Sequence, residues 1–349
     1  MNRLFNNFDK NKNFPIIIQP VSSQEADIDH LINEIKQSPQ ELLELLNTYG
    51  AVCFRGFKAV NTEKFQQLIQ VAELGELFNY DFGFRYDQEV AKGVVTSPFA
   101  SPLSSITPHS EKAHSGHYPD YICFYSKEAA RLGGQTPLTD NLKLWQCLPE
   151  QLKQKFATHK IYYKWHFFGD SLSYRFLRWL APPLKTYSWQ FRFKTMDSKA
   201  VEMILKREGF HFQWKQKNGN LSAGIKLPAY RIHPFTHEPM WFNHVSHMNT
   251  HYHFYRDLFV KNYKFPASVI MKKQSFLPCT AYWEDGSNFS ISEIEEVHQA
   301  IRDCTTPFTW QKDDILLVDN LRCMHAKRPH EGKRELLLTL LKRKNNLHD

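Results

Sequence analysis

Three short apolar runs constrain the fold of this chain more than any other feature of its sequence. They read "YICFYS" (121–126), "DDILLVDN" (313–320) and "RELLLTLLKR" (334–343). Short, continuous apolar runs of this kind are typical of strands. Aromatic residues make up 14% of the 349 residues, with 27 Phe, and this enrichment also favours β-structure around a wide apolar interior. We therefore expect a buried strand at 121–126, a core strand at 313–320 and a further strand at 334–343.

Further β-leaning segments extend this pattern along the chain. They include residues 16–18, 51–57, 160–169, 187–193, 210–216 and 239–248. No repeat, low-complexity tract or linker divides the sequence, so we expect one domain over residues 1–349. Its core is expected at about residues 50–343, preceded by an extension of helix and strand at 1–49. Short strands with helices packed outside them are typical of a jelly roll, whose two sheets can enclose a site.

Helices are indicated where apolar residues recur at helical spacing. We expect them around residues 27–36, 38–50, 62–74, 149–156, 198–208 and from 292 onward. Ser38 with Glu41, and Ser292 with Glu295, each fit a capping box, and Gly50 fits a helix end.

Charge, cysteine content and hydropathy argue against several classes of protein. The net charge is +8, yet no block of basic residues or basic aromatic stripe is present, so we expect no nucleic-acid partner. The positive excess instead suits anionic small molecules. The six scattered cysteines form no CxxC pair, which predicts reduced thiols. We find no signal peptide and no run of transmembrane length, and we expect a soluble cytoplasmic protein without a membrane partner.

Three histidines and one glutamate lie close together in "TPHSEKAHSGHYPDY" (107–121). Of these histidines only His109 has an acidic residue, Glu111, two positions later. On an extended strand both side chains would point to the same face and could bind one ion. Because the chain has 17 histidines, one such pair is also expected by chance, and alone it fits a solvated strand edge equally well.

A third candidate ligand strengthens the interpretation of this pair as a metal site. His325 follows an expected core strand in "ILLVDNLRCMH". Two histidines and one carboxylate, with open coordination positions, form the facial triad of non-haem Fe(II) oxygenases. The open positions admit O2 and a chelating oxo acid, which needs a basic anchor. Arg334 lies nine residues beyond His325, beside an apolar run, and a guanidinium binds carboxylate in a bidentate fork, although exposure is the commoner state of any one arginine.

Longer blocks of the sequence resemble a known family. The segment "PHSEKAHSGHYPDYICFYSKEAARLGGQTPLTD" (108–140) resembles the taurine dioxygenase/TfdA-like Fe(II)- and 2-oxoglutarate-dependent oxygenases, in particular the branch around the syringomycin-pathway hydroxylase. "WFNH", "YWEDGSNFS" and "LLVDNLRCMHAKRPHEGKRELLL" follow in the family's order, so the resemblance spans about residues 50–343. It implies a double-stranded β-helix, or jelly roll, of the clavaminate synthase-like type that uses Fe(II), 2-oxoglutarate and O2.

The resemblance also implies roles for single residues. His109, Glu111 and His325 match the iron triad. Thr136 and Arg334 match the threonine and arginine that bind a carboxylate of 2-oxoglutarate. Related halogenases have Ala or Gly where this chain has Glu111, so the glutamate implies oxygen transfer and argues against halogenation.

Departures from the family pattern lie close to the distal histidine. The family often has Gly or Ala and then Arg there, where this chain has Ala326, Lys327 and Arg328. His330 stands where Phe is frequent, and a "YGDGS" segment becomes "YWEDGS". These departures bear on the substrate and on the surroundings of the metal, not on the triad.

A second histidine cluster, "NHVSHMNTHYH" (243–253), is a rival metal site. His247 and His251 are four apart, as on a zinc-binding helix, but the HExxH general base is absent, so we interpret this cluster as lining a pocket or the surface. His114 and His117 lack a carboxylate at strand spacing, and we expect both in a loop.

Substrate contacts are predicted at four further residues. Arg85 and Ser97 precede the triad in a block where relatives shape the substrate pocket, and Asn243 and His244 stand in an interior block.

Together these features predict a dioxygenase that hydroxylates an amino acid or a related small polar molecule, free or tethered to a carrier protein, and releases succinate and CO2. Three alternatives remain open: desaturation at the same iron site, a jelly-roll binding or regulatory protein without catalysis, and a zinc hydrolase built on residues 243–253. The segments 76–106 and 160–260 are expected to line the substrate pocket.

Overall fold

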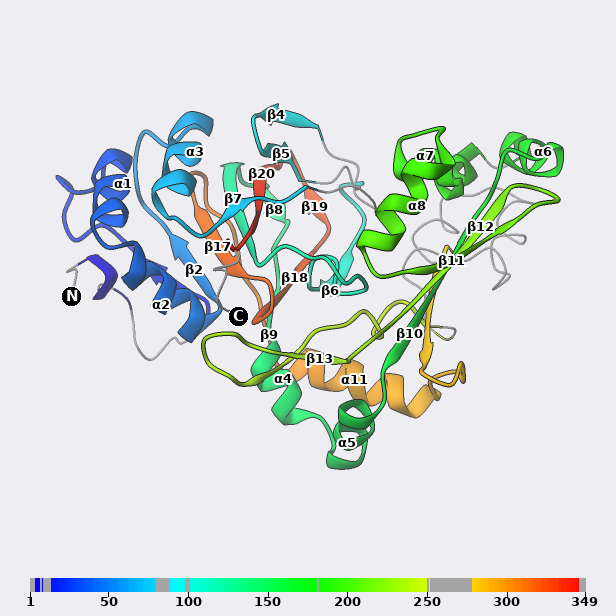
Figure 1. Ribbon diagram of the computed structural model, residues 1–349. Coiled ribbons are helices and arrows are strands. Elements are labelled where there is room, and N and C mark those ends of the chain that lie inside the picture. The colour runs from blue at the N-terminus through cyan, green and yellow to red at the C-terminus, as the bar shows by residue number, and fades with distance from the viewer. Residues whose placement is uncertain are drawn as a thin grey trace.

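Two facing sheets form the centre of the molecule, with helices on their outer sides (Figure 1). The computed structural model describes residues 4–6, 8, 14–79, 88–97, 101–180, 182–249, 251 and 278–344. No helix in these ranges is both long and apolar enough to span a bilayer.

The larger sheet contains the three apolar runs as adjacent strands. Its order is β1-β2-β17-β7-β20-β5-β4, and β3 also pairs with β20. The strands are β1 Ile16–Ile18, β2 Ala51–Phe54, β3 Glu76–Leu77, β4 Glu89–Ala91, β5 Val94–Thr96, β7 Tyr121–Glu128, β17 Ile315–Asp319 and β20 Glu335–Lys342. The strands predicted at 121–126, 313–320 and 334–343 are therefore confirmed.

Both faces of this sheet are buried, which explains why its central strands are apolar throughout. In β7, Cys123 and Tyr125 pack on the side of the N-terminal helices, whereas Ile122 and Phe124 face the sheet's interior side. Successive side chains of a strand point to opposite faces, so a strand covered on both sides shows no polar alternation.

Residues 14–49 complete the larger sheet. β1 runs parallel to β2, with Ile16 opposite Val52 and Ile18 opposite Phe54. The segment expected as an extension before residue 50 thus supplies one strand of the sheet. The organisation of residues 1–349 as a single domain stays a prediction.

The smaller sheet faces the larger one and carries the histidines of interest. Its order is β16-β9-β18-β6. The strands are β6 Ile106–His109, β9 Leu138–Asp140, β16 Thr305–Thr306 and β18 Cys323–Lys327, and a ribbon of β8 Leu132–Gly133 and β19 His330–Glu331 lies beside them. Two opposed sheets of short, mainly antiparallel strands confirm the predicted jelly roll.

A third sheet forms a second core next to the jelly roll. It has the order β11-β12-β10-β15. The strands are β10 Ile161–Phe167, β11 His211–Lys215, β12 Asn220–Leu227 and β15 Cys279–Trp283, with a ribbon of β13 Tyr230–Ile232 and β14 Pro239–Trp241. Large aromatic side chains such as Trp165 and Trp241 are fully buried there.

Helices cover these sheets in three groups (Figure 1). The first covers the outer face of the larger sheet. The second lies below the jelly roll (Figure 1) and, like the third, packs into the core of the third sheet. They are α1 Ile28–Gln37, α2 Pro39–Tyr49 and α3 Thr62–Val71; α4 Asn141–Cys147, α5 Glu150–Thr158 and α11 Ile291–Asp303; and α6 Leu172–Leu180, α7 Trp189–Phe193 and α8 Ser198–Arg207. The 3-10 helix η1 Leu4–Asn6 contacts β1, and η2 Pro182–Tyr187 contacts α6 and α7.

The expected strand at 187–193 is wrong, because this segment forms the short helix α7. Ser188 caps it by accepting a hydrogen bond from the backbone N–H of Phe191 at 3.3 Å. Trp189 and Phe193, four residues apart, bury one face of the helix.

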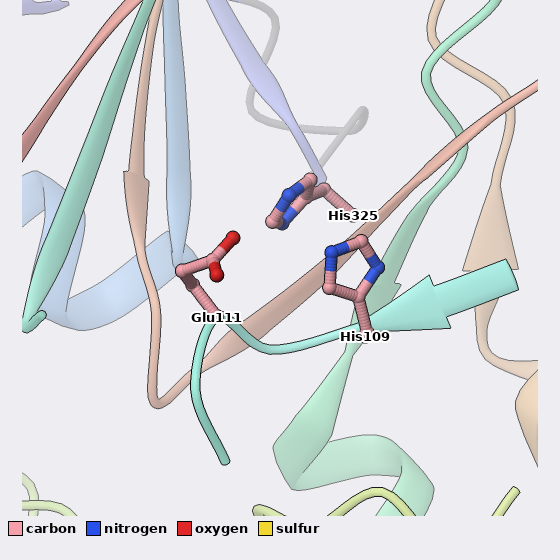
Figure 2. A group of neighbouring side chains, drawn as sticks. All are labelled: His109, Glu111 and His325. Carbon is pink, nitrogen blue, oxygen red and sulfur yellow. The ribbon is translucent and has the colours of Figure 1, made fainter. Parts of the chain in front are cut away.

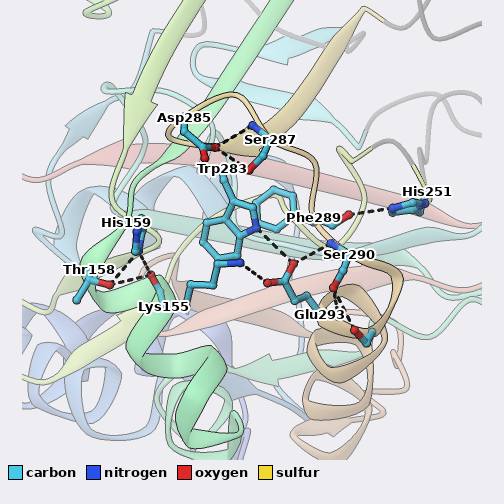
Figure 3. Close-up of polar contacts among 11 residues, drawn as sticks. Lys155, Thr158, His159, His251, Trp283, Asp285, Ser287, Phe289, Ser290 and Glu293 are labelled. Atoms are coloured by element: carbon cyan, nitrogen blue, oxygen red, sulfur yellow. Dashed lines mark hydrogen bonds and ion pairs between the residues drawn. The ribbon is translucent and has the colours of Figure 1, made fainter.

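Both expected capping boxes need correction. Ser38 makes no side-chain cap on α2; it also ends α1, where its backbone N–H bonds to the carbonyl of Glu34. In α11 the box is formed by Ser290 and Glu293, two residues before the expected pair. Figure 3 shows the reason: the Glu293 carboxylate also pairs with Lys155 at 2.5 Å and accepts from the Trp283 indole.

Candidate metal centre

The side chains of His109, Glu111 and His325 converge on one point between the sheets (Figure 2). Each offers one ligand atom, and these atoms lie within 4.8 Å of one another. Within the described part of the chain, no other group of three or more His, Cys, Asp or Glu residues has this geometry. Two imidazoles and one carboxylate are a donor set that suits a ferrous ion and leaves coordination positions for other ligands.

Strand pairing brings the two histidines together. His109 is the last residue of β6 and lies directly opposite His325 of β18, with ring centroids 4.4 Å apart. The Nδ1 atom of His109 lies 2.9 Å from the carbonyl oxygen of Thr107. A donated hydrogen bond there places the ring proton on Nδ1 and leaves the Nε2 lone pair available to a metal.

Glu111 reaches this point from a turn, so the expectation that it lies on an extended strand is wrong. β6 ends at His109, and Glu111 opens a turn in which Lys112 adopts a left-handed conformation with φ 57°. For a residue other than glycine this conformation costs on the order of 1 kcal/mol and has to be held by its surroundings.

One side chain, Asn320, holds the backbone of Glu111 from both sides. Its Oδ1 accepts from the N–H of Glu111 at 2.7 Å, and its Nδ2 donates to the carbonyl of Glu111 at 3.0 Å. The same amide donates to Pro119 at 2.8 Å, and Asn320 is fully buried. Sequence reasoning missed this residue; the available signal was the polar pair Asp319-Asn320 that directly follows an apolar strand.

A buried ion pair anchors the rest of the turn. Lys112 Nζ lies 2.8 Å from Glu208 Oε1, and both side chains are inaccessible to solvent. The hydroxyl of Ser115 donates to the other oxygen of Glu208. Glu208 follows the last turn of α8, so the turn that carries Glu111 is attached to a helix distant in sequence.

Beside the triad lies a cavity of about 60 Å³ between the two sheets. Its polar lining includes Ser97, Thr136, Lys327 and Arg334 in addition to the triad. Its apolar walls are Ile106, Ile122, Phe124, Ala326, Leu336, Leu338 and Leu340.

Arg334 is built into this cavity rather than exposed. It immediately precedes β20, donates from Nε to the carbonyl of Gly134 at 3.1 Å, and donates from Nη2 to Thr136 Oγ1 at 3.2 Å. Burial lowers the pKa of Arg334 to about 10 and that of Lys327 to about 8, where the charge of Arg334 contributes. The two residues that resemblance relates to 2-oxoglutarate are thus hydrogen-bonded to each other in one cavity with the triad.

His114 and His244 form a buried pair behind the metal centre. Their Nδ1 atoms lie 2.8 Å apart. His244 Nε2 lies 2.8 Å from the carbonyl oxygen of Ser110, the residue between His109 and Glu111 in the sequence. Burial lowers the pKa of His244 to about 3 and that of His114 well below its usual value, so both rings are neutral at pH 7. His114 and His117 both lie in the loop between β6 and β7, as expected, but the His114 ring is buried. His244 supports the turn from the other side of the pair.

The other residues predicted to contact the substrate are Ser97, Asn243 and Arg85. Ser97 lines the cavity, whereas Asn243 uses its amide within the fold, donating to Ala229 at 2.7 Å and accepting from the N–H of Val245 at 3.0 Å. Arg85 lies outside the described residues.

The rival cluster does not assemble a metal site from its described members. The rings of His244 and His247 lie 4.7 Å apart, but His251 Nε2 bonds to the carbonyl of Phe289 at 2.9 Å (Figure 3). His253 lies outside the described residues.

Known proteins resemble this chain over almost all of its length. The family described as "Taurine catabolism dioxygenase TauD, TfdA family" matches residues 17–340. The dapdiamide synthesis protein DdaC of Enterobacter agglomerans is 27% identical over 325 residues, which are 92% of this chain and 89% of that protein. A clavaminate synthase-like protein of Arabidopsis thaliana is 22% identical over 340 residues, 95% of each chain.

A solved structure supports the fold. PvcB from Pseudomonas aeruginosa superposes with a TM-score of 0.50 at 13% identity, covering 95% of this chain and 88% of its own. Because the family match covers most of the sequence, the chain belongs to the TauD/TfdA family and is an Fe(II)- and 2-oxoglutarate-dependent dioxygenase.

Proposed function

We propose that this dioxygenase hydroxylates an amino acid or a related small polar molecule, free or tethered to a carrier protein. In this proposal His109, Glu111 and His325 hold the iron, and Thr136 and Arg334 hold 2-oxoglutarate. One observation carries the assignment: three ligand atoms within 4.8 Å of one another line the same cavity as a partly buried arginine. No carboxylate of the described residues forms an ion pair with that arginine, which suits it to an anionic cosubstrate.

Iron with 2-oxoglutarate and O2 supplies the oxidation of a substrate C–H bond, with release of succinate and CO2. The residues of the chain orient and shield this chemistry. The hydrogen bond from His109 Nδ1 to Thr107 fixes the ring, and Asn320 fixes the backbone of Glu111. Phe124 and Leu338 belong to the apolar walls that exclude water from the cavity.

The carboxylate of Glu111 supports oxygen transfer over halogen transfer. A halide would need the coordination position that this carboxylate is placed to occupy beside His109 and His325. Desaturation would use the same residues, and analysis of the product distinguishes it from hydroxylation.

Similarity to a protein named for dapdiamide synthesis supports a small-molecule substrate from biosynthesis. We also infer that the protein acts in the reducing cytoplasm, because its six cysteines are scattered along the sequence and form no CxxC pair.

The test compares wild-type protein with Glu111→Ala. Under anaerobic conditions, wild type with Fe(II) and 2-oxoglutarate should develop a weak visible charge-transfer band, and in air with its substrate it should form succinate. Loss of residues that only orient metal ligands costs about 10- to 100-fold, so removal of a ligand should reduce succinate formation by more than about 100-fold.

His247→Ala is the control, since its ring lies 6.4 Å from that of His109 without belonging to the triad. It should retain iron. Undiminished turnover in Glu111→Ala, or loss of iron in His247→Ala with retention in His109→Ala, would overturn the assignment.

A further inference from the structure

Lys327 places a second positive charge in the cavity that contains Arg334. Residues two apart on a strand share a face, and Lys327 follows His325 by two positions on β18, although a register shift lies between them. Both side chains line the cavity together with Arg334 and Thr136.

The ammonium group of Lys327 is held by two backbone carbonyls. Its Nζ donates to Ser101 at 3.0 Å and to Ser104 at 2.8 Å. A lysine ammonium has three N–H groups, so these two bonds leave one donor for another acceptor. The loop that supplies the carbonyls is also tied down by the N–H of His330, which donates to Pro102 at 2.9 Å.

Two cations in one small cavity need an anion. Among the described residues that line the cavity, Glu111 is the one acidic side chain, and it lies with the imidazoles of the triad. Neither Lys327 nor Arg334 forms an ion pair with a carboxylate in the described ranges. Like charges brought close together in a partly desolvated space repel, and a bound dianion would offset that cost.

We propose that Lys327 binds the distal carboxylate of 2-oxoglutarate beside Arg334, and that it thereby selects a dicarboxylic 2-oxo acid over a monocarboxylic one. This inference rests on the proposed function, in which Arg334 and Thr136 hold the same cosubstrate. It adds a recognition residue and couples that residue to the loop at Ser101 and Ser104.

The experiment measures equilibrium binding, not turnover. Anaerobic, Fe(II)-loaded protein is titrated calorimetrically with 2-oxoglutarate and, separately, with 2-oxopentanoate, which has the same chain length but no distal carboxylate. Lys327→Gln keeps an N–H donor for the loop carbonyls and removes the charge. A hydrogen bond to a charged group corresponds to about 10- to 100-fold in affinity, so 2-oxoglutarate should bind that much more weakly to Lys327→Gln.

The affinity for 2-oxopentanoate should stay within about twofold of wild type, and Lys327→Arg should restore binding of 2-oxoglutarate. Arg328→Gln is the charge-matched control. Arg328 does not line the cavity; it lines a neighbouring groove of about 720 Å³ and is exposed, so its replacement should leave both affinities unchanged.

Two results would overturn the inference. If both acids lose affinity equally, Lys327 only supports the loop; if neither does, it does not contact the cosubstrate. Failure of the proposed function is a separate outcome, because the wild-type protein would then bind neither iron nor 2-oxoglutarate.

Discussion

Asn320 supports the metal centre without contacting the metal. Its amide bonds to both the N–H and the carbonyl of Glu111, and it is fully buried. Asn320→Leu removes these bonds at similar volume, so the backbone that carries the Glu111 carboxylate is no longer held in place. We expect affinity for Fe(II) to fall by about 10- to 100-fold, measured by anaerobic titration. Asn320→Asp keeps the acceptor but loses the donor, and should give an intermediate loss.

Asn220→Leu provides a matched control for that measurement. Asn220 is also buried and accepts a backbone hydrogen bond, from Gly169 at 2.8 Å, but it belongs to the third sheet. It should lower stability while leaving iron affinity intact. Equal iron affinities in Asn320→Leu and wild type would show that the clamp does not position Glu111.

At the scale of single residues, the sequence identified the groups that carry chemistry better than the groups that hold them. His109, Glu111 and His325 stand out by residue type and spacing, and the structure brings them together. The role of Asn320 and the burial of His114 were not foreseen, because both depend on what packs against the residue: a turn held by one amide, and a neutral imidazole pair in the core. Neither contact leaves a periodic signal in the chain.

The start of helix α11 allows a test at the scale of a secondary-structure element. The Ser290 hydroxyl accepts from the N–H of Glu293 at 3.2 Å, and the Glu293 carboxylate accepts from the N–H of Ser290 at 2.7 Å. Ser290→Ala should therefore lower the free energy of unfolding by about 1 kcal/mol in urea denaturation. Ser292→Ala, at the position that the sequence favoured, should change it by less than about 0.5 kcal/mol. A larger loss of stability in Ser292→Ala than in Ser290→Ala would show that Ser292 caps the helix.

Elements with a continuous apolar pattern were predictable, whereas short elements set by their neighbours were not. Strands β7, β17 and β20 are buried on both faces and show it in sequence. The helix α7 has only five residues, and its aromatic content resembles that of a strand. The choice between two overlapping Ser-x-x-Glu patterns in α11 depended on Lys155 and Trp283, which approach from other elements.

At the scale of the whole molecule, the metal centre depends on a contact between the jelly roll and the elements around the third sheet. The ion pair of Lys112 and Glu208 makes this contact: one partner follows Glu111 and the other ends α8. The turn also approaches α8 so closely that a side chain at Gly116 would lie 2.7 Å from the carbonyl oxygen of Glu208. The sequence could not show this pairing, because its partners are 96 positions apart and neither belongs to a motif.

Breaking this pair should destabilise the fold more than removing it. Lys112→Met leaves the Glu208 carboxylate buried without its cation, and we expect the free energy of unfolding to fall by about 3–5 kcal/mol in urea denaturation. Lys112→Met combined with Glu208→Met replaces both charges with apolar groups and should recover much of that loss. Lys127→Met, which breaks the exposed pair with Glu335, is the control and should cost less than about 1 kcal/mol. Two results would contradict this role of the pair. One is that Lys112→Met and Lys127→Met lower the free energy of unfolding equally; the other is that the Lys112→Met/Glu208→Met variant is the least stable of all.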